Sequence, residues 1–318
     1  MELKTDNKFK DTCPVCILTE AKNWLSLIDG INIDQCESCG VGYVNPYLNI
    51  DNNYYDDYGD YITKLPQNYF TRRLRLTLSK SVFFSVVSFF LGKSIHILDY
   101  GGGAGFFLNS AKLKGFYNLK LYEPSINFRR AAVEKVGLHE DQIIQSMADN
   151  SEKYDFVSML DVIEHLPQKD LANIISELCS HMHEGSYIFG ETPNKKSLNI
   201  TLFKEKDPVV CPPSHVLYFT TKSLDHLLCK HGFKKVLLVT KGLSTNSFFR
   251  QSKFKPSFVE MPKTKMQRAL SIAIKLIFAI LSLPLSLFGF GYQIIFLYRY
   301  ESVINAQNDK KVSLNDET

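Results

Sequence analysis

Four cysteines near the start of the chain have the spacing of metal ligands. They form two CxxC pairs, Cys13 with Cys16 and Cys36 with Cys39, and nineteen residues separate the pairs. Because a CxxC turn lets two thiolates face one ion, two such turns complete a tetrahedral sulfur site that suits Zn²⁺. Four thiolates leave no open coordination position, so the predicted role of the zinc is structural. A redox dithiol and an iron–sulfur cluster are the alternatives for the same cysteines.

A glycine-rich loop with an acid before it follows an apolar run in the stretch ILDYGGGAGFF. The acid is Asp99, and the glycines Gly101, Gly103 and Gly105 give the pattern GxGxG. The dinucleotide fingerprint GxGxxG requires a further glycine where Phe106 stands. A carboxylate beside the loop would repel a pyrophosphate and attract a cationic ligand such as S-adenosylmethionine. Taken alone, the loop leaves a dinucleotide and S-adenosylmethionine as alternatives.

A second acid follows the next apolar run. Glu123 lies 24 residues after Asp99, at the distance where a carboxylate accepts hydrogen bonds from both ribose hydroxyls of an adenosine. NAD enzymes use the same device, so Glu123 predicts an adenosine and leaves the cofactor undecided. A solvated acid at the end of a strand is the alternative.

A third polar group ends the run YDFVSMLDVIEHLP. It contains Asp161, Glu164 and His165. Two carboxylates and an imidazole can serve as a general base, as hydrogen-bonding groups that orient a substrate, or as metal ligands. The residues before this group are mostly apolar, so we expect it at the end of a buried strand, beside the ligand.

The elements that must position these residues alternate between strands and helices from residue 95 onward. This alternation predicts an α/β fold with a doubly wound parallel sheet, whose ligands lie at the carboxyl ends of the strands. The predicted strands are Ile95–Asp99, Leu119–Tyr122, Ile143–Met147, Tyr154–Leu160, Ser186–Gly190, Lys234–Thr240 and Gln293–Arg299. The predicted helices are Phe106–Leu113, Asn127–Val136, Lys169–His181 and Thr221–His231.

The motifs ILDYGGGAGFF, LYEPS and YDFVSMLDVIEHLP, in this order, resemble class I S-adenosylmethionine-dependent methyltransferases. The stretch SHVLYFTTKSLDHLLCKHGF resembles a later segment of the same family, and the cysteine module followed by GVGYVNP resembles bacterial members with an N-terminal zinc ribbon. The resemblance implies a Rossmann-like seven-stranded sheet with an antiparallel last strand. It also implies the residues that bind S-adenosylmethionine, namely Asp99, Gly101, Gly103, Gly105, Glu123, Met147 and Asp161.

For the acceptor side, Glu164 and His165 are the expected catalytic residues, with His165 as general base because its unperturbed pKa is near neutral. The DxxEH spacing also resembles the ExxEH motif of ubiquinone-pathway and small-RNA methyltransferases, which implies Mg²⁺ ligands that His215 could extend. A purely structural Glu164–His165 pair is the third alternative.

An apolar stretch, 269–290, contains one charged residue, Lys275, and a proline, Pro284. Because the family requires a last strand after it, we expect an inserted helical hairpin that is broken at Pro284 and lies on a membrane or on a partner. A soluble core helix or dimer face and a membrane span are the alternatives. The earlier run Val82–Leu91 is too short to span a membrane and is expected to pack on the sheet.

The whole chain of 318 residues divides into five predicted parts. They are a zinc ribbon (1–48), a tyrosine-rich linker with helices (49–94), the methyltransferase core (95–245), the apolar insertion with the last strand (246–300) and a disordered tail (301–318). The net charge of +4 is too small to indicate a nucleic-acid partner, and the polar N-terminus lacks the apolar segment of a secretion signal.

The expected enzyme therefore acts in the cytoplasm, at the inner face of the membrane if the apolar insertion binds lipid. Family analogy suggests a small-molecule or glycan acceptor, such as a nucleotide- or lipid-linked sugar. An oligomer is compatible with the apolar stretch. The alternatives are an NAD-linked oxidoreductase and a non-catalytic scaffold with a methyltransferase-like fold.

Overall fold

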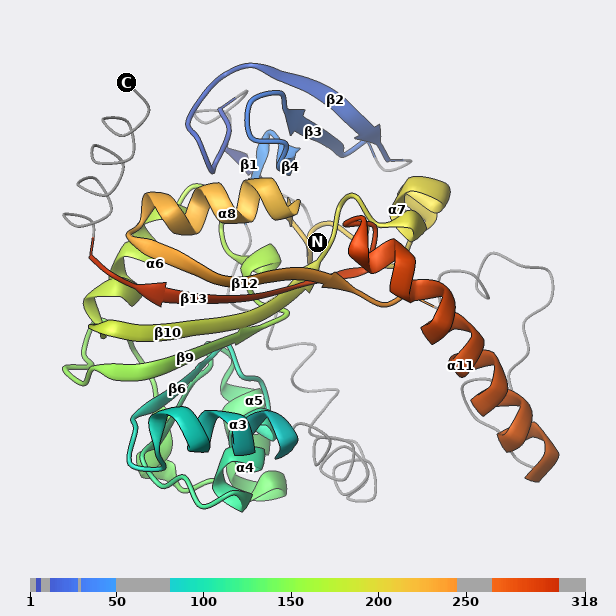
Figure 1. Ribbon diagram of the computed structural model, residues 1–318. Helices are drawn as coiled ribbons and strands as arrows, with labels where there is room; N and C mark the ends of the chain where they lie inside the picture. The colour runs from blue at the N-terminus through green and yellow to red at the C-terminus, as the bar shows by residue number, and fades with distance from the viewer. Residues whose placement is uncertain (1–3, 7–11, 28–29, 50–80, 245–264, 303–318) are drawn as a thin grey trace, which may run out of the picture.

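The computed structural model describes residues 4–6, 12–27, 30–49, 81–244 and 265–302. A seven-stranded sheet forms the centre, with the strand order β12-β13-β10-β9-β6-β7-β8 (Figure 1). β13 is antiparallel to both of its neighbours, and all other neighbours are parallel. This confirms the predicted fold class. The strands are β6 (Ile97–Tyr100), β7 (Leu119–Tyr122), β8 (Ile143–Ile144), β9 (Tyr154–Leu160), β10 (Met182–Pro193), β12 (Phe233–Lys241) and β13 (Gln293–Tyr300).

Helices cover both faces of this sheet, as Figure 1 shows. On one face α3 and α4 pack against the sheet through aromatic residues, and Phe83 contacts Phe107, Phe156 and Phe189. The prediction that Val82–Leu91 packs on the sheet is therefore confirmed. On the other face α6 and α8 bury leucines and isoleucines. The helices of the core are α3 (Ser81–Leu91), α4 (Phe106–Leu113), α5 (Ile126–Ala131), α6 (Leu171–Ser180), α7 (Leu198–Phe203) and α8 (Thr221–Lys230).

The predicted elements agree closely with those of the structure. β7, β9 and α4 begin and end at the predicted residues. β10 is longer than predicted and β8 is shorter, because β8 is an edge strand that pairs with β7 at two positions. The helix predicted over Asn127–Val136 is α5 followed by a π-helical turn, Ala132–Val136. Within the described ranges, short 3₁₀ helices lie at Glu140–Gln142, Ile163–His165 and Lys204–Lys206.

A second, four-stranded sheet has the order β11-β4-β3-β2. A hairpin lies between the two cysteine pairs and consists of β2 (Ala21–Ser26) and β3 (Asn32–Cys36), which pair in antiparallel fashion. β4 (Gly42–Asn45) continues the meander, and β11 (Leu217–Tyr218) is contributed by the segment before α8, far along the chain. A separate two-stranded sheet joins β1 (Lys4–Asp6) to β5 (Tyr47–Asn49).

The apolar stretch forms one continuous helix, α11 (Lys265–Leu287), so the predicted hairpin broken at Pro284 is wrong. Pro284 lies in the last turn, where a missing backbone N–H interrupts little of the remaining helix. The helix ends in a Schellman motif: Gly289 has φ +80°, Phe290 N–H donates to the carbonyl of Leu285 at 2.7 Å, and Gly289 N–H donates to that of Ser286 at 3.1 Å. β13 then returns to the sheet, as predicted.

Within the described ranges, no helix combines the length and the hydropathy that crossing a membrane requires. The tyrosine-rich stretch and the C-terminal tail of the sequence analysis lie outside the described residues.

Candidate active site and zinc centre

The glycine-rich loop leads from β6 into α4 and lets the backbone approach a ligand closely. Gly101, Gly103 and Gly105 all have positive φ, of 67°, 56° and 73°. A Cβ atom on Gly102 would collide with the carboxylate of Asp99 and lie 2.6 Å from Leu121 Cδ1. The shape of the turn therefore requires glycines at these positions. Because they have no side chains, a ligand can lie directly against the backbone of the loop.

Asp99 lies at the end of β6 and is almost fully buried. Its Oδ1 accepts a hydrogen bond of 2.6 Å from the hydroxyl of Ser158 on the neighbouring strand β9. Ser158 thus fixes the carboxylate beside the glycine loop. A negative charge held at this position suits a ligand that carries an ammonium or a sulfonium group.

Glu123 follows β7 directly and joins two backbone segments of the site. Its Oε2 accepts a hydrogen bond from the amide of Gly103 at 2.9 Å, and its Oε1 accepts one from the amide of Ser125 at 3.0 Å. Burial raises the pKa of this carboxyl, and the two amides and Arg129 oppose that shift. A carboxylate has about four lone-pair sites, so two remain for the hydroxyls of a ribose. The residues present fit an adenosine-containing cofactor.

The two other predicted cofactor residues lie at the same edge of the sheet. Met147 follows β8 and is buried in the main core. Asp161 follows β9 in a left-handed conformation with φ +54°, and its side chain is exposed and accepts a 3.5 Å hydrogen bond from Gln293. The carboxyl ends of β6, β7, β8 and β9 therefore bring together all of the predicted cofactor residues.

Glu164, His165 and His215 form a cluster beyond the end of β9. One ligand-capable atom from each residue lies within 4.8 Å of the other two. The imidazole rings of His165 and His215 meet edge to face with centroids 4.6 Å apart. Thr192 Oγ1 donates a hydrogen bond of 2.9 Å to Glu164 Oε2. Fifty residues separate the two histidines in sequence, so the pattern that revealed Glu164 and His165 left the role of His215 open.

Burial controls the protonation of this cluster. Glu164 is 1% exposed, and burial together with the charge of Asp161 raises its pKa to about 8. Burial lowers the pKa of His165, partly offset by a hydrogen bond to Ser214. Burial and the neighbouring His165 lower the pKa of His215 to about 3. Both imidazoles are therefore neutral near pH 7.

The same cluster has the donor set of a cation site. Glu164 Oε1 and His215 Nδ1 are buried atoms that have no hydrogen-bond partner among the described residues. Ser214 O lies 2.6 Å from His165 Nδ1; when this nitrogen donates to the carbonyl, the lone pair of the ring is on Nε2. Two imidazole nitrogens and one carboxylate oxygen suit a transition-metal ion better than Mg²⁺, which prefers oxygen ligands.

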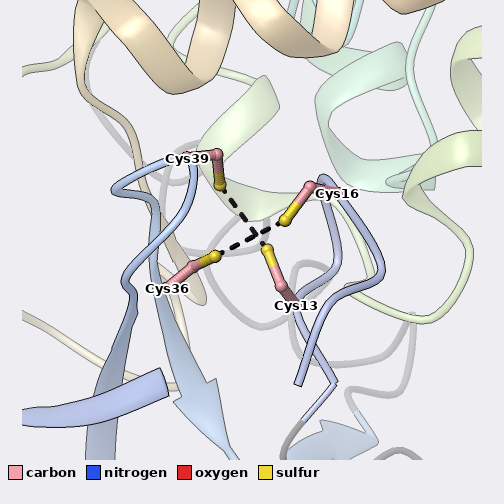
Figure 2. A group of neighbouring side chains, drawn as sticks. All are labelled: Cys13, Cys16, Cys36 and Cys39. Carbon is pink, nitrogen blue, oxygen red and sulfur yellow. Dashed lines mark hydrogen bonds between the residues drawn. The ribbon is translucent and has the colours of Figure 1, made fainter. Parts of the chain in front are cut away.

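The four cysteines of the N-terminal module converge on one point, as Figure 2 shows. The Sγ atoms of Cys13 and Cys39 are 3.6 Å apart, and those of Cys16 and Cys36 are 3.4 Å apart. A tetrahedral zinc–sulfur site with bonds of about 2.3 Å has sulfurs roughly 3.8 Å apart. Since the thiols lie close to this spacing and are largely buried, the residues fit a zinc ion with four thiolate ligands.

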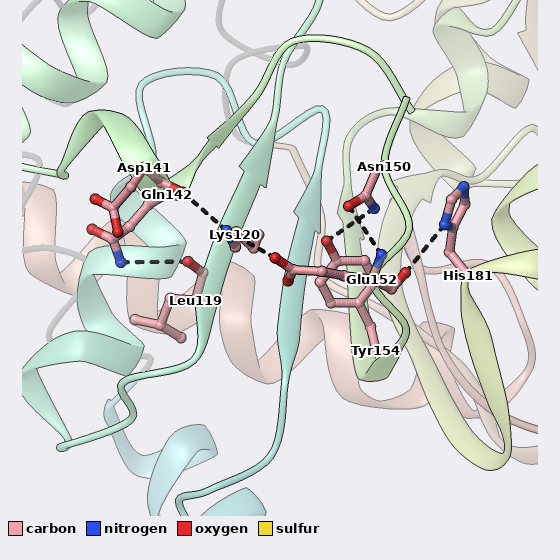
Figure 3. A network of polar contacts seen from close by, with 8 residues as sticks. All are labelled: Leu119, Lys120, Asp141, Gln142, Asn150, Glu152, Tyr154 and His181. Atoms are coloured by element: carbon pink, nitrogen blue, oxygen red, sulfur yellow. Dashed lines mark hydrogen bonds and ion pairs between the residues drawn. The ribbon is translucent and has the colours of Figure 1, made fainter. Parts of the chain in front are cut away.

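A cavity of about 500 Å³ lies at the opposite edge of the sheet, near the amino ends of the strands. Figure 3 shows the polar groups beside it. Lys120 Nζ is 3.0 Å from Glu152 Oε1 and donates a second hydrogen bond to the carbonyl of Asp141. These groups pair with one another and lie far along the strands from the glycine loop, so they support the fold and leave the carboxyl edge as the candidate site.

The sequence also matches a family model described as "Methyltransferase domain" over residues 70–238, which is more than half of the chain. A search of curated proteins found no match. Similar solved structures include a methyltransferase from Thermotoga maritima (16% identity, TM-score 0.47, 78% of this chain and 96% of that one). A second is a methyltransferase from Archaeoglobus fulgidus (20% identity, TM-score 0.44, 71% and 94%).

A third is the magnesium protoporphyrin IX methyltransferase from Synechocystis PCC 6803 with bound SAH, with 17% identity, a TM-score of 0.46 and coverage of 79% of this chain and 100% of that one. The strand order with one antiparallel strand agrees with the family match. The chain belongs to the methyltransferase domain family and is a class I methyltransferase that depends on S-adenosylmethionine.

Proposed function

We propose that the protein transfers the methyl group of S-adenosylmethionine to a small-molecule or glycan acceptor at the carboxyl edge of the central sheet. Asp99, Glu123, Met147, Asp161 and the loop glycines hold the donor. The observation that carries the proposal is that Glu123 accepts hydrogen bonds from both Gly103 and Ser125. Its carboxylate is thereby fixed beside the glycine loop and keeps lone pairs for the hydroxyls of an adenosine ribose.

Glu164 and His165 act on the acceptor in this proposal. Methyl transfer is an in-line displacement at an already activated sulfonium, so orientation supplies much of the rate. An acceptor hydroxyl also has to lose a proton, and a base held in position contributes about 10²–10⁴-fold. The lowered pKa of His165 leaves the imidazole neutral near pH 7 and able to accept that proton.

A divalent cation held by Glu164, His165 and His215 is the second candidate for this step. It is favoured by two buried atoms, Glu164 Oε1 and His215 Nδ1, for which the described part of the chain offers no hydrogen-bond partner. Metal analysis of protein supplied with Zn²⁺ or Mn²⁺ separates the two candidates. A second ion per chain that is lost in His215→Asn, while the first ion stays, supports the cation, and a single ion in wild type supports the base.

The four cysteines hold a structural zinc ion in this proposal, as part of a ribbon module over residues 1–48. The support is the spacing of the sulfurs, 3.4 Å and 3.6 Å, together with the burial of Cys13, Cys36 and Cys39. The proposed boundaries of the other parts are those stated in the sequence analysis: 49–94 for the linker, 95–245 for the core, 246–300 for the insertion with the last strand, and 301–318 for the tail.

We also propose that α11 makes peripheral contact with the inner face of an anionic membrane. In the part of α11 whose side chains are described, several large apolar side chains are exposed, with Leu287 86% and Ile280 64% accessible. The helix sequence contains three basic residues and no acidic residue, which suits anionic lipid. Asn194, at the end of β10, donates hydrogen bonds to the carbonyls of Gly289 and Gly291. α11 thus extends from the acceptor edge (Figure 1), as a lipid-linked acceptor would require.

Vesicle co-sedimentation tests the membrane proposal. The protein should co-sediment with phosphatidylglycerol vesicles and should not bind phosphatidylcholine vesicles. Ile280→Glu should abolish binding to the phosphatidylglycerol vesicles. If the protein binds neither kind of vesicle, the proposal is refuted. A dimer in sedimentation velocity that Ile280→Glu dissociates would identify α11 as a contact between copies of the chain instead.

The proposed activity is tested by titration calorimetry with S-adenosylmethionine and by release of S-adenosylhomocysteine with a panel of nucleotide sugars. Binding that is lost in Glu123→Ala and turnover with at least one sugar are expected. Failure of the zinc-loaded protein to bind S-adenosylmethionine refutes the donor site. Binding without turnover across glycan and small-molecule acceptors favours a methyltransferase-like scaffold.

A further inference from the structure

The zinc ribbon and the acceptor-side cluster are joined by one short backbone segment, residues 214–218. Within it, Val216 donates its N–H to the carbonyl of Glu164 at 3.0 Å and accepts a hydrogen bond from the N–H of Val44 at 3.1 Å. Val44 belongs to β4 of the ribbon. A single residue thus connects a strand of the ribbon to the backbone of a cluster residue.

The pairing of strands extends this connection. β11 aligns Leu217 with Tyr43 and Tyr218 with Gly42 of β4. The paired residues are buried, and Tyr43, Val216, Leu217 and Tyr218 are each at most 2% exposed. Because the strands of both modules form one sheet with a continuous core, residues 214–218 have a fixed position relative to the ribbon.

Both histidines of the cluster are held by this segment. His165 Nδ1 lies 2.6 Å from the carbonyl of Ser214, and the hydroxyl of Tyr218 donates to the carbonyl of His215 at 2.9 Å. Gln168, three residues after His165, donates a hydrogen bond of 2.8 Å to the carbonyl of Val44. The ribbon therefore contacts the cluster from the 164–168 side and from the 214–218 side.

The metal-binding turn lies close to this contact along the chain. Cys36 donates its N–H to the carbonyl of Val41, and Gly40 donates its own to Cys36. Cys39 precedes β4 by three residues, and β3, which ends at Cys36, pairs with β4 along its length. The position of β4 therefore depends on the geometry of the four cysteines.

We propose that the zinc ribbon is a structural part of the acceptor site, because it fixes the strand that places His215 against Glu164 and His165. His215 is accordingly an acceptor-side residue. The inference rests on the proposed function for the role of the cluster. The donor side is organised by other contacts, those of Glu123 with Gly103 and Ser125, so loss of zinc should loosen the acceptor side and leave the donor side ordered.

Hydrogen exchange of the full-length chain, read by mass spectrometry, tests the inference. We compare zinc-loaded wild type with Cys39→Ser and measure the affinity for S-adenosylmethionine in parallel. Exchange within 214–218 and 161–168 should rise at least tenfold in the variant. Exchange within 97–105 should stay the same, and the affinity for S-adenosylmethionine should change less than twofold. Unchanged exchange within 214–218 overturns the inference.

A second variant covers the case in which Cys39→Ser fails to fold. Gln168→Leu removes the hydrogen bond to Val44 and leaves the cysteines intact. It should keep the wild-type zinc content and still raise exchange within 214–218. Gln142→Leu is the matched control, because Gln142 is also buried and donates to a backbone carbonyl, that of Leu119 at the start of β7, away from residues 214–218. Equal exchange in Gln168→Leu and wild type refutes the inference, whereas failure of wild type to bind S-adenosylmethionine refutes only the proposed function.

Discussion

The carboxylate of Glu123 accepts a hydrogen bond from the backbone amide of Gly103 at 2.9 Å. This bond ties the end of β7 to the glycine loop after β6, although twenty residues separate the two in sequence. The end of β7 and the glycine loop are therefore already held together in the protein without a ligand. Cofactor binding should then depend on Glu123 in two ways. Its carboxylate accepts hydrogen bonds from the ribose, and it holds the glycine loop in place through Gly103.

Glu123→Ala should weaken the binding of S-adenosylmethionine about 10–100-fold. Hydrogen bonds to a charged group contribute about 1.5–3 kcal/mol each, and the alanine variant loses the acceptor and the contact with the loop. Titration calorimetry measures the change. Glu140→Gln serves as control because this acid is exposed on the neighbouring 3₁₀ helix. An unchanged affinity in Glu123→Ala would remove Glu123 from the site.

Cofactor affinity should fall in weak acid. Burial raises the pKa of Glu123, and only the ionised carboxylate accepts hydrogen bonds from both ribose hydroxyls. Below this raised pKa the free protein holds a proton that binding has to displace, so affinity decreases as the pH falls through it. Calorimetry between pH 8 and pH 5 should show this decrease in wild type. Glu123→Gln should bind weakly and without that pH dependence, and a parallel decrease in the variant would contradict the assignment.

Local patterns predicted the central fold because they encode it directly. β9 is a mostly apolar run that is followed by the acid Asp161, and α4 follows a glycine loop, so the local sequence of both elements indicates where they begin and end. The length of β8 depends on β7, with which it pairs at two positions. The local sequence of β8 does not show where this pairing stops, so the predicted strand is too long. In α11, by contrast, a local signal predicted a feature that the structure does not have. Proline at position 284 predicted a break, but its place in the last turn of the helix made the break unnecessary.

The site shows the same division between local and distant information. Glu164 and His165 are adjacent in sequence and could be predicted together. Their association with His215 arises because β11 pairs with a strand of the ribbon, and no spacing rule connects residues 165 and 215. The contact between the ribbon and the core was likewise beyond a reading of sequence motifs, since it consists of backbone hydrogen bonds between Val44, Val216 and Glu164.

Alanine at Gly102 should disturb the loop more than alanine at Gly103. A Cβ on Gly102 would collide with the Asp99 carboxylate and Leu121, whereas the nearest atom to a Cβ on Gly103 is Phe128 Cδ1 at 3.8 Å. Overpacking costs about 1–3 kcal/mol, and a left-handed alanine costs about 1–2 kcal/mol. Both variants should melt earlier, and Gly102→Ala should also lose S-adenosylmethionine binding because Asp99 is displaced. Equal binding by the two variants would contradict the role given to Asp99.

Removal of one thiolate should release zinc and lower the melting temperature. Cys36 is fully buried and belongs to the four-cysteine cluster, so Cys36→Ser leaves three thiolates for an ion that prefers four. Metal analysis should find one zinc per chain in wild type and less than that in the variant. Cys229→Ser is the control, since Cys229 lies on α8 outside the cluster. Zinc content that is equal in Cys36→Ser and Cys229→Ser would refute the zinc site.

Substitution of the acceptor-side histidine should separate binding from chemistry. His165→Asn keeps a polar group of similar size but has no basic nitrogen, so S-adenosylmethionine should bind as in wild type. Release of S-adenosylhomocysteine, with whichever acceptor the panel identifies, should fall about 10²–10⁴-fold, the usual contribution of a general base. His96→Asn is the control because His96 is exposed at the opposite edge of the sheet. Turnover within twofold of wild type in His165→Asn would exclude this imidazole from the reaction, and an equal loss in His96→Asn would show that the effect is structural.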